Sequence, residues 1–220
     1  MSTFVLLASQ YKGGSTLLMR VLNNFPGVQI SGENSGAFAS LMEFYGAMKN
    51  TDSIKHTQDF VDLQLGKPSW YNQFNLMKIK NDIKNLIFNI YKSESMTHFG
   101  FKEIRFGANE DYDRMEKTFK LLKEIIPELK LVLLTRKRNF IDNEHDIDYL
   151  KNDRISTEDE YENQFQYFRR FASENPSYSY VIDYSELASI PAQAQVINLF
   201  NFLGIEFYNV KFDEVMKFRL

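Results

Sequence analysis

The chain contains no cysteine among its 220 residues. This absence excludes disulfide bonds, a catalytic thiol and thiolate metal sites. The three histidines, His56, His98 and His145, lie far apart in the sequence, which argues against a zinc site. The chain also lacks an excess of basic residues, and its formal net charge of −3 argues against a broad nucleic-acid-binding surface. We therefore expect no metal ion and no nucleic acid among its ligands.

Long apolar runs are absent as well. No stretch approaches the about 20 apolar residues that a membrane-spanning helix requires. Phe4–Ala8 is short and is followed at once by Gln10 and Lys12, so the N-terminus does not resemble a signal peptide. These features indicate a cytoplasmic protein that does not bind membranes. Hydrophobic residues make up 44% of the chain and charged residues 25%, which is typical of a globular protein, and the length favours a single domain over residues 1–220.

Five short segments rich in apolar, branched or aromatic residues predict β-strands. They are Phe4–Ser9, Val28–Ser31, His98–Ile104, Leu129–Thr135 and Ser179–Tyr184. Apolar residues at helical spacing predict helices over Ser15–Asn24, Asn75–Tyr91, Tyr112–Ile126, Glu158–Ser173 and Pro191–Leu203. Strands that alternate with helices favour a three-layer α/β/α fold around a mainly parallel sheet of about five strands. In such sheets ligands bind beyond the carboxyl ends of the strands.

A glycine-containing turn joins the first predicted strand to the first predicted helix. It can direct backbone N–H groups at an anion, and the start of the helix adds unsatisfied donors and the positive end of the helix dipole. Ser15 and Thr16 add hydroxyl donors, and Lys12 adds a positive charge. The sequence therefore predicts a phosphate-binding loop over Gln10–Thr16, with an ordinary tight turn as the alternative.

This loop departs from the nucleotide-hydrolase and kinase pattern G-x-x-x-x-G-K-[ST]. Aligning Gly13 with the second glycine of the pattern places Gly14 at the position of the lysine, and Lys12 stands two residues earlier. The missing lysine argues against an ATP-driven kinase. It suits a site that binds fewer phosphates and places its charge beside one bridging oxygen.

The segment Lys12–Leu18 resembles the 5′-phosphosulfate loop of the P-loop-type sulfotransferases, commonly written [RK]-x-G-[ST]-[ST]-x-[LW]. Asn23–Pro26 and Ser31–Glu33 are similar to the continuation of that motif in tyrosylprotein-type and bacterial members, more than to the cytosolic phenol and steroid enzymes. The sulfuryl donor of the family is 3′-phosphoadenosine 5′-phosphosulfate. The resemblance implies a P-loop NTPase-like fold and a donor-binding loop of Lys12, Gly13, Gly14, Ser15, Thr16 and Leu17.

The same resemblance assigns roles to residues at other predicted strand ends. Lys12 neutralises the leaving 5′-phosphate, and Lys102, in the segment HFGFKEIRF, approaches the sulfuryl group. Arg136 grips the 3′-phosphate, which suits the planar guanidinium group, and Tyr184 borders the nucleotide. Glu33 matches the glutamate that accepts the proton of the sulfate acceptor.

Two positions leave alternatives open. His145 is a second candidate for the base, and Glu144 stands where the family usually has a serine that helps to bind the 3′-phosphate. The leading prediction is a metal-independent sulfotransferase that acts on a hydroxyl or amine of a small molecule, glycan or peptide, with residues 35–95 forming a mainly helical segment on the acceptor side. The alternatives are a P-loop kinase for nucleotides or small molecules, and a non-catalytic nucleotide-binding protein of the same fold, which Glu144 favours.

Overall fold

The structure of the protein is a computed structural model that describes residues 2–10, 13–54, 75–104, 112–136, 158–188 and 194–217. Each strand is followed by at least one helix along the chain. In order they are β1 (Thr3–Ser9), α1 (Ser15–Asn23), β2 (Val28–Ser31), α2 (Ala37–Ile54), α4 (Leu76–Tyr91), β3 (His98–Glu103), α5 (Tyr112–Ile125), β4 (Leu129–Thr135), α7 (Glu158–Glu174), β5 (Ser179–Asp183), α8 (Tyr184–Leu187), α9 (Ala194–Leu203) and α10 (Asn209–Lys217).

The five strands form one parallel sheet in the order β2-β3-β1-β4-β5. β1 is the central strand, and its residues Phe4–Ala8 are fully buried. A strand covered on both faces carries a continuous apolar run, because both sets of alternating side chains face packed helices. The prediction of an α/β fold with a parallel sheet of five strands is confirmed.

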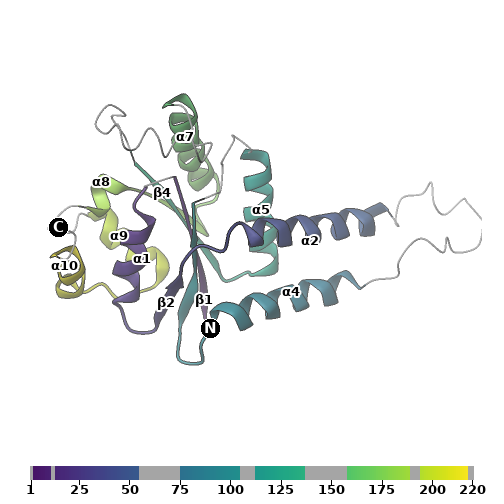
Figure 1. Cartoon of the computed structure of the whole chain (residues 1–220), viewed down its shortest axis with the longest axis horizontal. Helices are drawn as coiled ribbons and strands as arrows, with labels where there is room; N and C mark the ends of the chain where they lie inside the picture. The colour runs from purple at the N-terminus through teal and green to yellow at the C-terminus, as the bar shows by residue number, and fades with distance from the viewer. Residues whose placement is uncertain are drawn as a thin grey trace, which may run out of the picture.

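Helices cover both faces of the sheet (Figure 1), and a separate core lies on each face. Phe4 and Phe101 point toward α2, α4, α5 and α7, where their rings pack at a centroid distance of 6.0 Å. Val5 and Leu134 point toward the opposite core, which is built with α1, α8, α9 and α10. The alternation of side chains along each strand therefore determines which helices a residue meets.

Helices α2 and α4 lie side by side and extend beyond the sheet (Figure 1). Phe38, Met42 and Tyr45 of α2 and Ile83 and Ile87 of α4 are buried in the first core. Both helices fall in the segment 35–95 that was predicted to be mainly helical, and residues 55–74 between them lie outside the described part of the chain.

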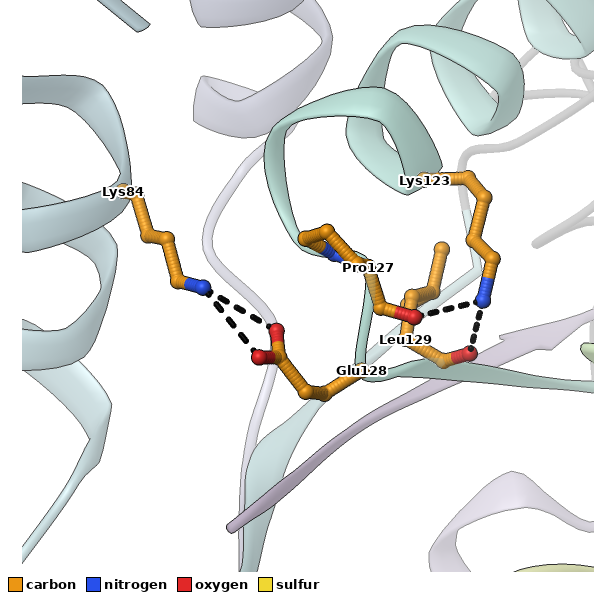
Figure 2. Close-up of polar contacts among 5 residues, drawn as sticks. All are labelled: Lys84, Lys123, Pro127, Glu128 and Leu129. Atoms are coloured by element: carbon orange, nitrogen blue, oxygen red, sulfur yellow. Dashed lines mark hydrogen bonds and ion pairs between the residues drawn. The ribbon is translucent and has the colours of Figure 1, made fainter. Parts of the chain in front are cut away.

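A network of lysine contacts fixes the turn between α5 and β4 (Figure 2). The Lys123 ammonium group donates to the carbonyl oxygens of Pro127 at 2.7 Å and Leu129 at 3.4 Å, so it satisfies acceptors just beyond the helix end. Lys84 of α4 pairs with Glu128 at 3.0 Å. Burial, together with the charge of Lys130, lowers the pKa of Lys123. The Lys84–Glu128 pair therefore ties α4 to the start of β4.

Three features differ from the sequence prediction. Helices α2 and α10 were not predicted as separate elements, although Phe38, Met42 and Tyr45 have helical spacing. Tyr184 begins helix α8 and is not the last residue of β5, because the Asp183 carboxylate accepts from the Ser185 N–H at 2.9 Å and caps the helix.

Within the described ranges, no helix is long and apolar enough to cross a membrane.

Candidate functional site

The carboxyl ends of the strands meet at one edge of the sheet. Ser9 at the end of β1 is level with Leu134 in β4, and Thr135 is level with Asp183 in β5. On the other side of β1, Ala8 is level with Glu103, the last residue of β3. The segments that follow these strands therefore start from the same edge, as the sequence predicted.

The loop after β1 is anchored by a buried glutamine. The backbone N–H of Gln10 donates to Leu134 O at 3.1 Å, and its side-chain oxygen accepts from the N–H of Arg136 at 3.1 Å. Its carbonyl oxygen accepts from the Gly13 N–H at 2.9 Å and from the Ser9 hydroxyl at 2.6 Å. Gln10 thus fixes the start of the loop against the end of β4, so the loop and Arg136 cannot move independently.

Both glycines of the loop are required by the space around them. A Cβ atom on Gly13 would lie 2.6 Å from the Ser9 hydroxyl oxygen and 2.9 Å from the Gln10 carbonyl oxygen. Gly14 has a φ angle of 94°, a left-handed conformation that a residue with a side chain rarely adopts. A Cβ atom there would also lie 2.4 Å from Cδ2 of Tyr184. No lysine can occupy position 14 in this conformation without displacing that ring.

The start of α1 is suited to an anion. Gly14 is the N-cap residue and supplies no side-chain hydrogen bond, and the first turn, which is described in full, contains no acidic residue. The N–H groups of Ser15, Thr16 and Leu17 have no partner within a helix that begins here, since the Leu18 N–H makes the first bond to the Gly14 carbonyl oxygen at 3.0 Å. Ser15 is buried and Thr16 is exposed. These donors can bind phosphate oxygens.

Tyr184 connects this loop to Arg136. The Arg136 guanidinium group lies over the Tyr184 ring, 4.3 Å from its centroid, a cation–π contact. The same ring closes the space beside Gly14. The three predicted donor-site residues Gly14, Arg136 and Tyr184 are therefore neighbours, although they come from three separate segments of the chain.

Lys102 and Glu33 form an ion pair with an Nζ–Oε1 distance of 2.6 Å. Their side chains are 12% and 28% exposed, so the pair is partly shielded from water. Lys102 lies in β3, and Glu33 lies in the loop between β2 and α2. The structure thus brings together two of the three residues that were predicted to be catalytic.

The third of them, Lys12, lies outside the described residues, as do Glu144 and His145. Their predicted roles at the leaving group, in the 3′-phosphate site and as the alternative base remain predictions. The described residues contain no group of three histidine, aspartate or glutamate side chains that could hold a metal ion.

Sequence reasoning missed the residues that hold the β2 edge. The Asn23 side chain donates to Ile30 O at 2.9 Å and accepts from the Ile30 N–H at 2.6 Å, so it satisfies both backbone groups of this residue in the edge strand. A second contact that was missed is made by Glu103, at the end of β3, whose carboxylate accepts from the Gly36 N–H at 3.1 Å, directly before α2. Neither contact has a local sequence signal, because Ile30 is 7 residues from Asn23 and Gly36 is 67 residues from Glu103.

Among the described residues, two hollows lie away from this edge. One, of about 350 Å³, lies between α2 and α5 and has lysine and carboxylate side chains in its wall, including Lys49, Lys117, Asp113 and Glu116. The other, of about 300 Å³, lies where β1 and β4 begin. The first mixes both signs of charge, and the second lies at the amino ends of the strands, so the carboxyl edge remains the candidate site.

A comparison with solved structures finds a similar fold in the sulfotransferase domain from the olefin synthase of Synechococcus PCC 7002. The TM-score is 0.55 at 17% sequence identity, and the match covers 96% of this chain and 77% of that domain. No protein-family model matches the chain, and no curated protein matches it. At this identity the similarity establishes the fold, and it agrees with the sheet and helix arrangement described above.

Proposed function

We propose that this protein is a sulfotransferase that moves a sulfuryl group from 3′-phosphoadenosine 5′-phosphosulfate to a hydroxyl or amine acceptor. The observation that carries the proposal is the contact of Tyr184 with both Gly14 and Arg136. The Tyr184 ring thus links the anion-binding start of α1 to the guanidinium group of Arg136. Such an arrangement suits a nucleotide that carries phosphate at two separate positions.

Gly14 supports this proposal over an ATP-dependent kinase. In the kinase pattern this position holds the lysine that clamps the β- and γ-phosphates. Here the positive φ angle and the Tyr184 ring leave no room for a side chain. The activity ascribed to the similar olefin synthase domain supports the same choice.

The proposed reaction is an in-line displacement at sulfur. The acceptor oxygen or nitrogen forms a bond to sulfur while the bond between sulfur and the bridging oxygen breaks, and the electron pair of that bond remains on the 5′-phosphate. Lys12, Lys102 and the N–H groups of Ser15 and Thr16 stabilise the negative charge that develops there. Glu33 takes the acceptor proton.

The Lys102–Glu33 pair has a place in this scheme. With no donor present, the Lys102 ammonium group neutralises the Glu33 carboxylate. A phosphosulfate group at the helix start offers the same ammonium group several charged acceptor oxygens, so it competes with the Glu33 carboxylate. Once Lys102 turns toward the donor, the Glu33 carboxylate becomes available as a base.

A calorimetric titration with adenosine 3′,5′-bisphosphate and with ATP tests the proposal. We expect the bisphosphate to bind without magnesium and ATP to bind weakly. Tight magnesium-dependent ATP binding would instead identify a kinase. Binding of the bisphosphate without turnover in a screen of phenol, sugar, amine and tyrosine-peptide acceptors would identify a non-catalytic binding protein.

Two substitutions separate the roles in turnover. Lys12→Ala should lower the transfer rate at least about tenfold, since a hydrogen bond to a charged group contributes on the order of 1.5–3 kcal/mol. Glu33→Gln should lower turnover while donor affinity stays within about twofold, because the base acts on the acceptor. Lys78→Ala is the matched control, since Lys78 is 73% exposed and lies in α4. Full activity of the Lys12 variant contradicts the assignment.

A further inference from the structure

The last two residues of β3 hold the loop between β2 and α2 from opposite faces of the sheet. Side chains alternate along a strand, and Phe99, Phe101 and Glu103 are all buried, with the two phenylalanines in the core under α2 and α5. Lys102 therefore points to the other face, where it meets Glu33. The loop crosses the end of β3 between these two contacts.

The Glu103 side chain binds the backbone of this loop on the side away from Lys102. It is only 1% exposed. Its Oε2 accepts from the Gly36 N–H at 3.1 Å, and its Oε1 accepts from the N–H of Ile104 at 3.0 Å. Gly36 directly precedes α2, so the carboxylate also lies at the positive end of that helix. A charged acceptor makes a stronger bond to this N–H than a neutral one.

The loop needs such support, because its own conformation is unfavourable. Ser35 has a φ angle of 58° and Gly36 one of 78°, so two consecutive residues are left-handed. Within the described ranges, the buried amide nitrogen and oxygen of the Asn34 side chain have no hydrogen-bond partner. Backbone conformations of this kind persist only where surrounding groups hold them.

We propose that Glu103 is a positioning residue that keeps Glu33 opposite Lys102 by anchoring Gly36 at the start of α2. Gly36 is three residues from Glu33, so release of its N–H frees the loop to move the Glu33 carboxylate away. The catalytic consequence rests on the proposed function: without Glu103, the proposed base is no longer held beside the lysine that approaches the donor. The geometric claim does not depend on the reaction.

The reactivity of the Lys102 amine tests the claim without donor or acceptor. The folded protein is treated with a limiting amount of an acetylating N-hydroxysuccinimide ester, and Lys102 acetylation is followed by peptide mass spectrometry. Glu33→Gln should raise its rate by about two- to fivefold, the factor expected when a partly exposed ion pair is lost. Glu103→Leu should raise it by a similar factor. The double variant should show no further increase, because both changes remove the same pair.

Glu116→Gln is the matched control, since Glu116 pairs with Lys120 on α5 and also accepts from Tyr167. It should raise acetylation of Lys120 and leave that of Lys102 unchanged. Glu103→Gln covers the case in which the leucine variant does not fold, because it keeps the shape and an acceptor oxygen. It should give a smaller increase in the same direction, with faster hydrogen exchange at the Gly36 amide.

A general structural role for Glu103 predicts a different pattern. It predicts faster acetylation of many lysines and weaker binding of adenosine 3′,5′-bisphosphate, whereas the positioning role predicts a local change with bisphosphate affinity within about twofold. Unchanged Lys102 acetylation in a folded Glu103 variant, or additive effects in the double variant, would overturn the proposal. If acetylation behaves as expected but the bisphosphate does not bind to wild type, only the proposed function fails.

Discussion

Replacing Gly14 with alanine tests whether Tyr184 closes the anion-binding loop. Gly14 combines two properties that an added methyl group would oppose. Its φ angle is 94°, and the Cβ position lies 2.4 Å from Cδ2 and 3.1 Å from Cε2 of the Tyr184 ring. The ring cannot move freely, because the Arg136 guanidinium group lies over it.

The expected cost has two parts. A left-handed conformation costs a residue with a Cβ atom about 1–2 kcal/mol. Overlap with a packed ring adds about 1–3 kcal/mol, the usual range for inserting a methyl group where there is no space. We therefore expect Gly14→Ala to lower the free energy of unfolding by about 2–5 kcal/mol.

Urea unfolding of Gly14→Ala and Gly204→Ala separates the two parts. Gly204 directly follows α9 with a φ angle of 75°, and no atom of another part of the chain lies within 4 Å of its Cβ position. Its substitution should therefore show only the conformational cost, about 1–2 kcal/mol. Adding Tyr184→Ala to the Gly14 variant removes the ring, so the double variant should recover the steric part relative to the sum of the single effects.

The same variants should differ in ligand binding. Gly14→Ala displaces Tyr184 and with it Arg136, so adenosine 3′,5′-bisphosphate should bind more weakly. Gly204→Ala, whose site is the C-terminal end of α9, should bind as wild type does. The reasoning is refuted if the two alanine variants lose equal stability, or if removing the Tyr184 ring brings no recovery.

Two further predictions concern stability. Burial and the hydrogen bond to Glu124 raise the pKa of Tyr45 from 10.0 to about 12. The folded protein keeps the Tyr45 proton to a higher pH than the unfolded chain does. The stabilisation from the protonated hydroxyl is therefore complete below pH 10 and is lost as the pH rises toward 12. Between pH 8 and 11, the free energy of unfolding in urea should fall by about 1 kcal/mol more for wild type than for Tyr45→Phe. Asp183→Ala removes the cap of α8 and an acceptor of the Thr135 hydroxyl at 3.2 Å, so it should lower the free energy of unfolding by about 1 kcal/mol. Asp183→Asn should retain most of the wild-type stability, because asparagine also caps helices.

Strands β1 and β4 were predictable because each is a run of apolar residues whose burial on both faces leaves a direct mark in the sequence. Val28–Ser31 and Leu129–Thr135 were predicted with the same bounds that the structure has. The predicted end of β5 is one residue too late. In the segment Asp183-Tyr184-Ser185-Glu186, the aspartate and the glutamate form a capping box that begins a helix. That spacing was readable from the sequence and was overlooked.

The candidate site was predictable only where a residue follows a strand or belongs to the glycine loop. Gly14, Arg136 and Tyr184 were predicted for the same site, and the structure places them next to one another. The contacts of Gln10 and Glu103 were not predicted, because a buried polar residue resembles an exposed one until its partner is known. Their partners, Arg136 and Gly36, come from other segments of the chain, and only the fold brings them together.

The sheet order has a consequence for synthesis of the chain. Among the described strands, β1 pairs with β3 and β4, and β2 pairs with β3, so neither β1 nor β2 has one of these partner strands until residue 98 has been made. At about 5–20 residues per second, the apolar run Phe4–Ala8 waits on the order of 5–20 s on the ribosome. A nascent chain that ends before β3 should therefore be the species that chaperones bind, and extension through Thr135 should release it.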